Sequence, residues 1–275
     1  MPVMSIRVCV AGATGWAGSA LVKKILASQE FVLTGAIARQ GAGEDIGVRL
    51  GGKPSGLQIS ATLDEALHVP TDVLVDYTKP DSVKARTLAA MSKGLRVVIG
   101  TSGLTAVDFD EIAVEATKRN LGVIAAGNFS ITAALAKHFA LFAAQHIPSW
   151  EIIDYAHAEK PDAPSGTVRE LAEELGNVAK DRIAFPIEQT HGTKEARGGM
   201  IAGTPVHSIR LPSYVISFET IFGLPDERLT IRHDSGTSAE PYVGGTLLAI
   251  REVMKIKGLV RGLDRLLFPS SSRAQ

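Results

Sequence analysis

The sequence lacks several features that would place it in a specialised class of protein. Lys and Arg together number 29, as do Asp and Glu, so the formal net charge is zero at pH 7. Without an excess of positive charge, binding to nucleic acid or to an anionic membrane surface is not favoured. No apolar run approaches the roughly 18 residues that cross a bilayer, and no apolar signal core opens the chain. We therefore expect a cytoplasmic protein whose partner is a small molecule.

Cysteine and metal-ligand clusters are also scarce. The single cysteine, Cys9, lies in an apolar run, so no disulfide can form within the chain and a buried, unreactive thiol is expected. His191 and His233 are isolated, and no set of His, Cys, Asp and Glu has metal-ligand spacing, so we expect no metal. The nucleophile motif Gly-x-Ser-x-Gly is missing as well.

What the sequence does contain is an alternation of short β-branched runs with longer helical stretches. The predicted strands are 7–11, 32–38, 72–76, 96–100 and 122–126, and the predicted helices are 18–27, 84–92 and 106–119. This alternation is typical of an α/β fold with a doubly wound, Rossmann-type parallel sheet.

After residue 128 the pattern changes. The chain reads as a helix at 132–145, a strand at 150–156 and a helix at 165–175, then alternates in twos at 207–211, 214–222 and 228–233. Alternation in twos between short turns is typical of antiparallel strands. We predict a second α+β domain with a mixed, largely antiparallel sheet, followed by helices at 245–255 and 260–267.

A turn with glycines three residues apart follows the first predicted strand and leads into a helix. Glycine lets a pyrophosphate approach the backbone, and the free N–H groups and dipole of the helix face the phosphates. The alternative is a tight turn that binds nothing. The residues that we expect to bind a dinucleotide are Gly12, Ala13, Thr14, Gly15, Trp16 and Ala17.

No acid follows the second predicted strand, where a carboxylate would bind the ribose 2′-hydroxyl of NAD. Arg39 stands there instead and could pair with the 2′-phosphate of NADP and stack on the adenine. We therefore predict that NADPH is preferred and keep NADH as the alternative cofactor. The competing interpretation is that Arg39 is a solvated surface residue.

Two further loops follow strand ends at the same edge of the predicted sheet. Ligands of open parallel sheets lie beyond the carboxyl ends of the strands, so these loops are placed to hold the ribose and the nicotinamide. As simple turns they would look much the same. The residues that we assign to cofactor binding are Tyr77, Thr78, Gly100, Thr101 and Ser102.

The most unusual segment is 155–167, a strand end that runs into a loop with two prolines and then into a helix. Ser165, Gly166 and Thr167 present backbone N–H groups at a helix N-terminus suited to a carboxylate. A capping box made by Thr167 and Glu170 is the structural alternative, and the two can coexist because several amides remain after capping. Lys160 could supply the proton or the cation that hydride transfer requires.

These motifs resemble the dihydrodipicolinate reductase family, which reduces a cyclic unsaturated dicarboxylate in lysine biosynthesis. The resemblance extends over nearly the whole chain and is carried by the glycine loop and by segments 76–80, 100–103, 128–130 and, above all, 160–167. It implies that Lys160 is catalytic, that Gly166 and Thr167 hold a substrate carboxylate, and that Asn128 and Phe129 belong to the cofactor site.

The resemblance also has implications for the organisation of the chain. It implies a dinucleotide-binding domain at 1–128 that is completed by about 238–275. The part between them, 129–237, is expected to bind substrate and to mediate oligomerisation. The expected assembly is a homo-oligomer, a tetramer or a dimer, with the tetramer built through the sheet of the second domain.

Three departures from the family pattern lie on the substrate side. Ala156 stands where the family has the first of two histidines, its usual proton donor. The segment 213–218 lacks the acid and histidine of a Gly-Glu-His-Thr-type segment, and Ala239 followed by Glu240 lies near the place of a family arginine. His157 is the remaining donor candidate, although a shift of one residue along a strand points its side chain to the opposite face.

We therefore expect an NAD(P)H-dependent reductase that transfers a hydride to a small unsaturated, imine-like carboxylate, with Lys160 and His157 as catalytic and substrate-binding residues. One alternative is a reductase of the same fold that acts on a different substrate. Another is a non-catalytic NADP-binding regulator, which the missing histidine supports. The retained Lys160 and the loop at 165–167 argue against a regulator.

Overall fold

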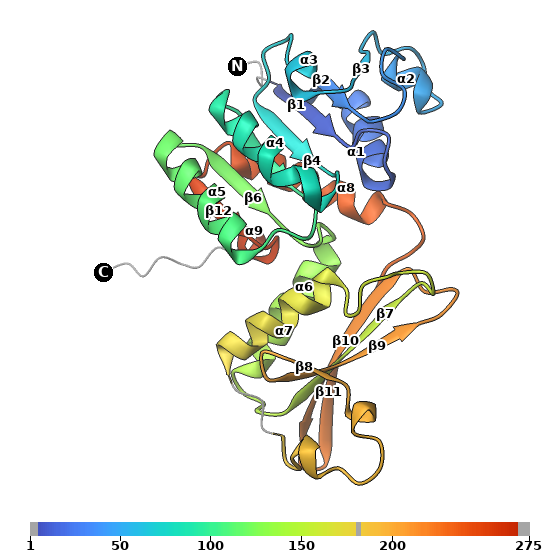
Figure 1. Ribbon diagram of the computed structural model, residues 1–275, viewed down its shortest axis with the longest axis vertical. Helices are drawn as coiled ribbons and strands as arrows, with labels where there is room; N and C mark the ends of the chain where they lie inside the picture. The colour runs from blue at the N-terminus through green and yellow to red at the C-terminus, as the bar shows by residue number, and fades with distance from the viewer. Residues whose placement is uncertain (1–4, 180–182, 269–275) are drawn as a thin grey trace. The chain divides into compact units, whose positions relative to one another are not determined.

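The computed structural model describes residues 5–179 and 183–268. The chain forms two compact units, one that extends to Ile131 and resumes at Ala239, and one that comprises Thr132–Ser238 (Figure 1). None of the helices in the described ranges combines the length and the hydropathy that a membrane crossing requires.

The first unit is built on a seven-stranded sheet in which every strand pair is parallel. The spatial order is β12 (Gly258–Arg261), β6 (Gly122–Ala125), β5 (Arg96–Ile99), β4 (Val73–Asp76), β1 (Ile6–Ala11), β2 (Phe31–Ile37) and β3 (Ile59–Ser60). The chain runs from β1 to β2 on one side and returns to β4 on the other side of β1. Nucleotides bind open parallel sheets at such a reversal of strand order.

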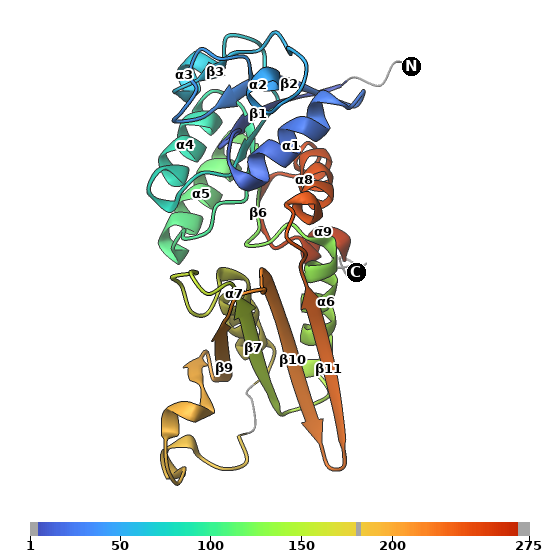
Figure 2. The same cartoon turned by 90° about the vertical axis from the view of Figure 1, so that its right-hand side faces the viewer.

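Helices cover both faces of this sheet (Figure 2). On one face lie α3 (Leu63–Ala66), α4 (Pro80–Ser92) and α5 (Ala106–Arg119), and on the other α1 (Trp16–Leu26) packs against α8 (Glu240–Val253). The central strands are short apolar runs because both of their faces are covered; every residue of β4 and β6 is buried. The prediction of a doubly wound Rossmann-type sheet is confirmed. The remaining helices of this unit are the short α2 (Ile46–Arg49) and α9 (Asp264–Leu267).

The second unit is built on a five-stranded mixed sheet. Its order is β11 (Glu227–Asp234), β10 (Ile216–Leu224), β7 (Trp150–Ala156), β9 (Thr204–Arg210) and β8 (Gly199–Ile201). Only the pair β7–β9 is parallel, so the predicted mixed, largely antiparallel sheet is confirmed. The helices α6 (Ile131–Ala144) and α7 (Gly166–Val178) pack on one face, and the short 3-10 helices η1 (Ile187–Gln189) and η2 (Lys194–Arg197) precede β8.

The prediction of a buried, unreactive cysteine is confirmed, whereas one predicted helix near the C-terminus is partly wrong. The single cysteine is buried as expected, and burial raises the pKa of the Cys9 thiol to about 12, so the thiol is unreactive at neutral pH. The predicted helix at 260–267 is wrong in its first half, because residues 258–261 form β12 beside β6 and only Asp264–Leu267 are helical. A run this short has too few residues for periodicity to distinguish a strand from a helix.

Candidate functional site

The turn after β1 is shaped by close backbone contacts that only glycine permits. Gly12 has φ +81°, and a Cβ there would lie 2.2 Å from the carbonyl oxygen of Tyr77, in the loop after β4. A Cβ on Gly18 would lie 2.1 Å from the carbonyl oxygen of Gly12, so α1 sits directly against the turn. The loops of the two strands at the reversal point therefore meet without side chains between them.

The start of α1 suits a phosphate group. The N-cap residue of α1 is Gly15, which has no side chain to cap the first amides of the helix. Ala13 is buried below the turn, whereas Gly15 and Trp16 are exposed and Thr14 and Ala17 are partly buried. Uncapped helical N–H groups and the helix dipole together favour an anion, so the described residues fit the pyrophosphate of a dinucleotide.

Arg39 lies two residues beyond the end of β2 and is exposed. It forms no hydrogen bond or ion pair with any residue that the structure describes. Its guanidinium is therefore available to a ligand at the carboxyl edge of the sheet, on the side of β1 where β2 lies.

A buried carboxylate organises the loops after β4 and β5. Asp76 is fully buried and accepts hydrogen bonds from the backbone N and Oγ1 of Thr78, at 3.0 and 2.6 Å, and from Oγ1 of Thr101 at 3.0 Å. Arg86 of α4 places Nη1 2.7 Å from the other Asp76 oxygen and 2.8 Å from Oγ1 of Thr78. Thr78 and Thr101 are thus brought together by Asp76 and Arg86, two residues that sequence reasoning missed. A charged residue that ends a buried strand was the available signal.

Three other predicted cofactor residues contribute packing. The ring centroids of Tyr77 and Phe129 lie 6.1 Å apart. A Cβ on Gly100 would lie 2.1 Å from the Tyr77 ring, so this position has no room for a side chain. The Tyr77 hydroxyl is 2.5 Å from Oγ1 of Thr246 in α8, and burial raises the pKa of Tyr77. Phe129 is itself buried. The side chains of Tyr77 and Phe129 therefore pack inside the first unit.

The other two predicted cofactor residues lie at loop surfaces of the first unit. Asn128 is partly buried, and its Oδ1 accepts a hydrogen bond from the backbone N of Ser130 at 2.8 Å. Ser102 is exposed in the loop after β5.

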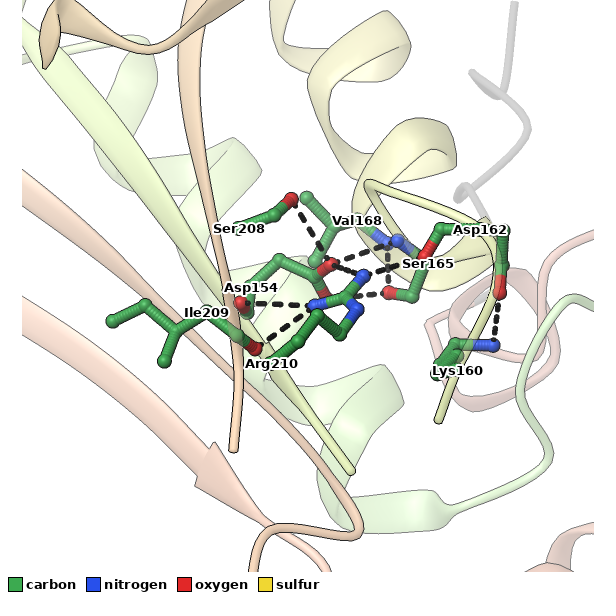
Figure 3. Close-up of polar contacts among 8 residues, drawn as sticks. All are labelled: Asp154, Lys160, Asp162, Ser165, Val168, Ser208, Ile209 and Arg210. Carbon is green, nitrogen blue, oxygen red and sulfur yellow. Dashed lines mark hydrogen bonds and ion pairs between the residues drawn. The ribbon is translucent and has the colours of Figure 1, made fainter. Parts of the chain in front are cut away.

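In the second unit the turn after β7 brings the two predicted catalytic residues together. His157 is exposed, and its carbonyl oxygen accepts a hydrogen bond from the backbone N of Lys160 at 3.1 Å. Nζ of Lys160 lies 2.7 Å from Oδ1 of Asp162 (Figure 3). Burial would raise the pKa of Asp162, but the hydrogen bond and charge of Lys160 outweigh it and lower that pKa. The ion pair therefore persists at neutral pH and is lost as the pH falls through the lowered value.

The start of α7 differs from the sequence prediction. The cap is Ser165, whose Oγ accepts from the backbone N of Val168 at 3.4 Å, so the predicted capping box of Thr167 and Glu170 is wrong. The reason is that α7 begins at Gly166, before Thr167, and that Glu170 instead pairs with Nζ of Lys137 at 2.7 Å.

The hydroxyl of Ser165 is committed to the protein. Ser165 is buried, and its Oγ donates to Oδ1 of Asp154 at 2.7 Å. Gly166 and Thr167 carry the first two amides of α7, at the end of the helix where its dipole favours an anion. The peptide bond between Ala163 and Pro164, just before the cap, is cis.

Two of the three departures from the family pattern are neighbours in the second unit. Ala156 is fully buried at the end of β7 and pairs with Ile216 of β10, inside the segment 213–218. A methyl group thus occupies the position where the family pattern has a proton donor. Within the described ranges, no group of three or more His, Cys, Asp or Glu side chains could hold a metal ion.

Two known protein families together match nearly the whole chain. The family described as dihydrodipicolinate reductase, N-terminus, matches residues 6–129, and the family described as dihydrodipicolinate reductase, C-terminus, matches residues 129–267. The 4-hydroxy-tetrahydrodipicolinate reductase of Desulfitobacterium hafniense is 38% identical over 264 residues, which cover 95% of this chain and 98% of that protein. The enzyme of that name from Moorella thermoacetica is 38% identical over 266 residues, 96% of this chain and 99% of its own.

Solved structures agree with these relatives. A dipicolinate-bound dihydrodipicolinate reductase from a Paenisporosarcina species has a TM-score of 0.80 at 31% identity and covers 95% of this chain and 99% of its own. The amine dehydrogenase of Mycobacterium smegmatis has a TM-score of 0.65 at 17% identity, over 96% of this chain and 97% of its own, which shows a shared fold alone. Because both family matches together span almost the entire chain, the protein belongs to the dihydrodipicolinate reductase family, whose members are oxidoreductases that use a pyridine nucleotide.

Proposed function

We propose that this chain reduces 4-hydroxy-tetrahydrodipicolinate, or a closely similar cyclic imine-like dicarboxylate, with a nicotinamide nucleotide. The observation that carries the proposal is the conjunction of Lys160, ion-paired in the turn after β7, with the amides of Gly166 and Thr167 at the start of α7. Relatives at 38% identity are named for this reaction. The two units divide the work, the first holding the nucleotide and the second the substrate.

The residues of the first unit bind and orient. The amides at the start of α1 receive the pyrophosphate, and the loops of Thr78 and Thr101, joined through Asp76, support the ribose and nicotinamide. When bound, the nucleotide supplies the hydride.

The residues of the second unit bind the substrate and stabilise the charge that forms on it during the reaction. The amides of Gly166 and Thr167 bind a carboxylate of the substrate at the positive end of the helix dipole. Addition of a hydride to the carbon of a C=N bond leaves an electron pair on nitrogen. The positive charge of the Lys160 ammonium stabilises this electron pair, and Nζ donates a proton to the nitrogen. Asp162 keeps Lys160 in place before the substrate arrives, and His157, in the same turn, is the second candidate donor.

The test is an assay of nucleotide oxidation with 4-hydroxy-tetrahydrodipicolinate, together with calorimetric binding of dipicolinate, the ligand named in the Paenisporosarcina structure. Turnover with that substrate and measurable dipicolinate binding are expected. If the substrate is inert but a panel of cyclic imines and 2-oxo acids contains one that is reduced, Ala156 and its neighbours have changed specificity. Tight NADPH binding without any turnover would instead support a regulator.

We propose further that NADPH is the preferred nucleotide, because Arg39 is exposed at the end of β2 and pairs with no described residue. The change Arg39→Ala should lower kcat/KM with NADPH by about tenfold to a hundredfold, the range expected for one charge-assisted contact to a phosphate, and leave kcat/KM with NADH within about twofold. The matched control is Arg49→Ala, which removes an exposed arginine that pairs with Glu44 in the same unit. Equal or better wild-type kcat/KM with NADH would contradict the proposal.

We also propose a homotetramer built through the sheet of the second unit. The hydrophobic core of the second unit lies on the face of the sheet that α6 and α7 cover. The opposite face of the sheet presents Ile153, Ile209 and Ile221, each only partly buried. The change Ile153→Glu should place a charge in that contact and reduce the mass measured by light scattering from a tetramer to a smaller species. A monomeric wild-type protein would refute the proposed assembly.

A further inference from the structure

A buried acid joins the end of β7 to the start of α7. The Asp154 side chain is 0% exposed, and its carboxylate accepts from the backbone N of Ser165 at 2.8 Å and from its Oγ at 2.7 Å. Oγ of Ser208, on β9, lies 3.4 Å from the same carboxylate. One strand side chain therefore fixes both the backbone and the side chain of the residue that caps α7 (Figure 3).

Arg210 completes this arrangement from the neighbouring strand β9. Its Nη2 lies 2.7 Å from Oδ2 of Asp154 and 2.7 Å from the carbonyl oxygen of Asp162, in the middle of the loop (Figure 3). Its Nη1 donates to the carbonyl oxygen of Ile209 at 3.0 Å, which orients the guanidinium. A single nitrogen thus links the sheet to the loop that contains Lys160.

The loop 157–165 has few other fixed points. Lys160 closes a turn by donating its backbone N to His157, and the loop contains Pro161 and Pro164, which have no N–H to donate. Among the described residues, its hydrogen bonds to the sheet are those of the Asp162 carbonyl, which binds Arg210, and of Ser165, which binds Asp154. The position of the loop relative to the sheet therefore depends on the Asp154–Arg210 pair.

Net stability is a poor explanation for such a pair. Removing two charges from water costs free energy that their attraction repays incompletely, and well-packed apolar residues often stabilise a core as much. What the pair provides is geometry, because a planar guanidinium can bind acceptors on two segments at once and apolar side chains cannot. A loop that must hold an ammonium and two amides at fixed positions requires that geometry.

We propose that Asp154 and Arg210 are positioning residues for the reaction: they fix the loop 157–165 so that Lys160 and the amides of Gly166 and Thr167 keep the spacing that the substrate needs. Neither side chain touches the reacting atoms; both act through the loop. The assignment rests on the proposed function, since it presumes that these groups bind the substrate.

The experiment compares Arg210→Met and the milder, isosteric Asp154→Asn with a matched control, Lys137→Met. Lys137 is a buried cation that pairs with Glu170 and Glu174 of α7, each at 2.7 Å, so its loss also breaks ion pairs on this helix, and both of these partners lie outside the loop 157–165. Each protein is checked for folding by circular dichroism and for its Tm. The readouts are hydrogen exchange of peptides covering 157–168, calorimetric affinity for dipicolinate, kcat/KM for the substrate and Kd for NADPH.

In Arg210→Met and Asp154→Asn, backbone amides within 157–168 should exchange hydrogen faster than in wild type. Dipicolinate affinity and kcat/KM should fall by about tenfold to a hundredfold, while Kd for NADPH stays within about twofold. Lys137→Met should lower Tm without these changes. The proposal is overturned if loop exchange does not change, or if dipicolinate affinity and kcat/KM fall no further than in Lys137→Met. Should wild type neither bind dipicolinate nor turn over, the proposed function fails, whereas loop exchange in the variants still decides whether the pair holds the loop.

Discussion

Replacement of Lys160 by alanine should lower kcat at least about a hundredfold, because the charge that develops after hydride addition would lose its proposed proton donor and cation. The proposed nucleotide site lies in the other unit, so the Kd for NADPH should remain unchanged. Single-turnover kinetics with saturating NADPH would measure the chemical step directly.

Two companion variants sharpen that result. Lys160→Arg keeps a positive charge that can pair with Asp162, but an arginine does not release its proton at neutral pH. A loss as large as that of alanine would identify proton transfer as the main role of Lys160, and substantial recovery would identify charge stabilisation. Lys255→Ala, which removes an exposed lysine that pairs with Glu252, is the control. If Lys160→Ala loses less than threefold in kcat, Lys160 has no part in the mechanism.

Replacement of Arg86 by methionine should reduce the free energy of unfolding by about 3–5 kcal/mol, because it leaves the fully buried Asp76 without its cation. The loops of Thr78 and Thr101 share that carboxylate, so KM for the nucleotide should rise as well. Urea denaturation measures the first effect and initial rates measure the second. Arg49→Met, which breaks an exposed ion pair of the same unit, should change stability by at most about 1 kcal/mol.

The double variant Asp76→Asn with Arg86→Met tests the cause. An amide oxygen can still accept from Thr78 and Thr101, and no unpaired charge remains, so the double variant should be more stable than Arg86→Met alone. A double variant that is no more stable than the single one would show that Arg86 acts through packing and not through the charge of Asp76.

Two of the departures from the family pattern lie close together in the second unit. Ala156 pairs with Ile216, which lies within the segment 213–218, so these changes alter one end of one sheet. The ion pair of Lys160, the cap of α7 and the Asp154–Arg210 pair are all present beside this altered region. A regulator would not need the charged lysine of the family motif, so the presence of Lys160 favours an enzyme.

Local pattern was enough to predict much of the fold. The run Val73–Val75 in β4 is apolar because both faces of the strand are covered, and that signal requires no knowledge of distant residues. The glycine turn was equally readable, since the requirements at Gly12 and Gly18 arise from contacts with backbone that any chain would present. Short elements such as β12 escaped prediction because their pairing partner, not their own sequence, makes them strands.

The sequence by itself determined where the glycine turn, the Lys160 loop and the two sheets lie along the chain, because glycine spacing and hydrophobic period are local properties. Only the tertiary structure decided which charges hold those loops. Arg86 and Asp76 are separated by 10 positions in the sequence, and Arg210 and Asp154 by 56. Neither spacing predicts that the two residues form an ion pair. Strand order and register choose such partners, and burial then makes the choice costly to undo.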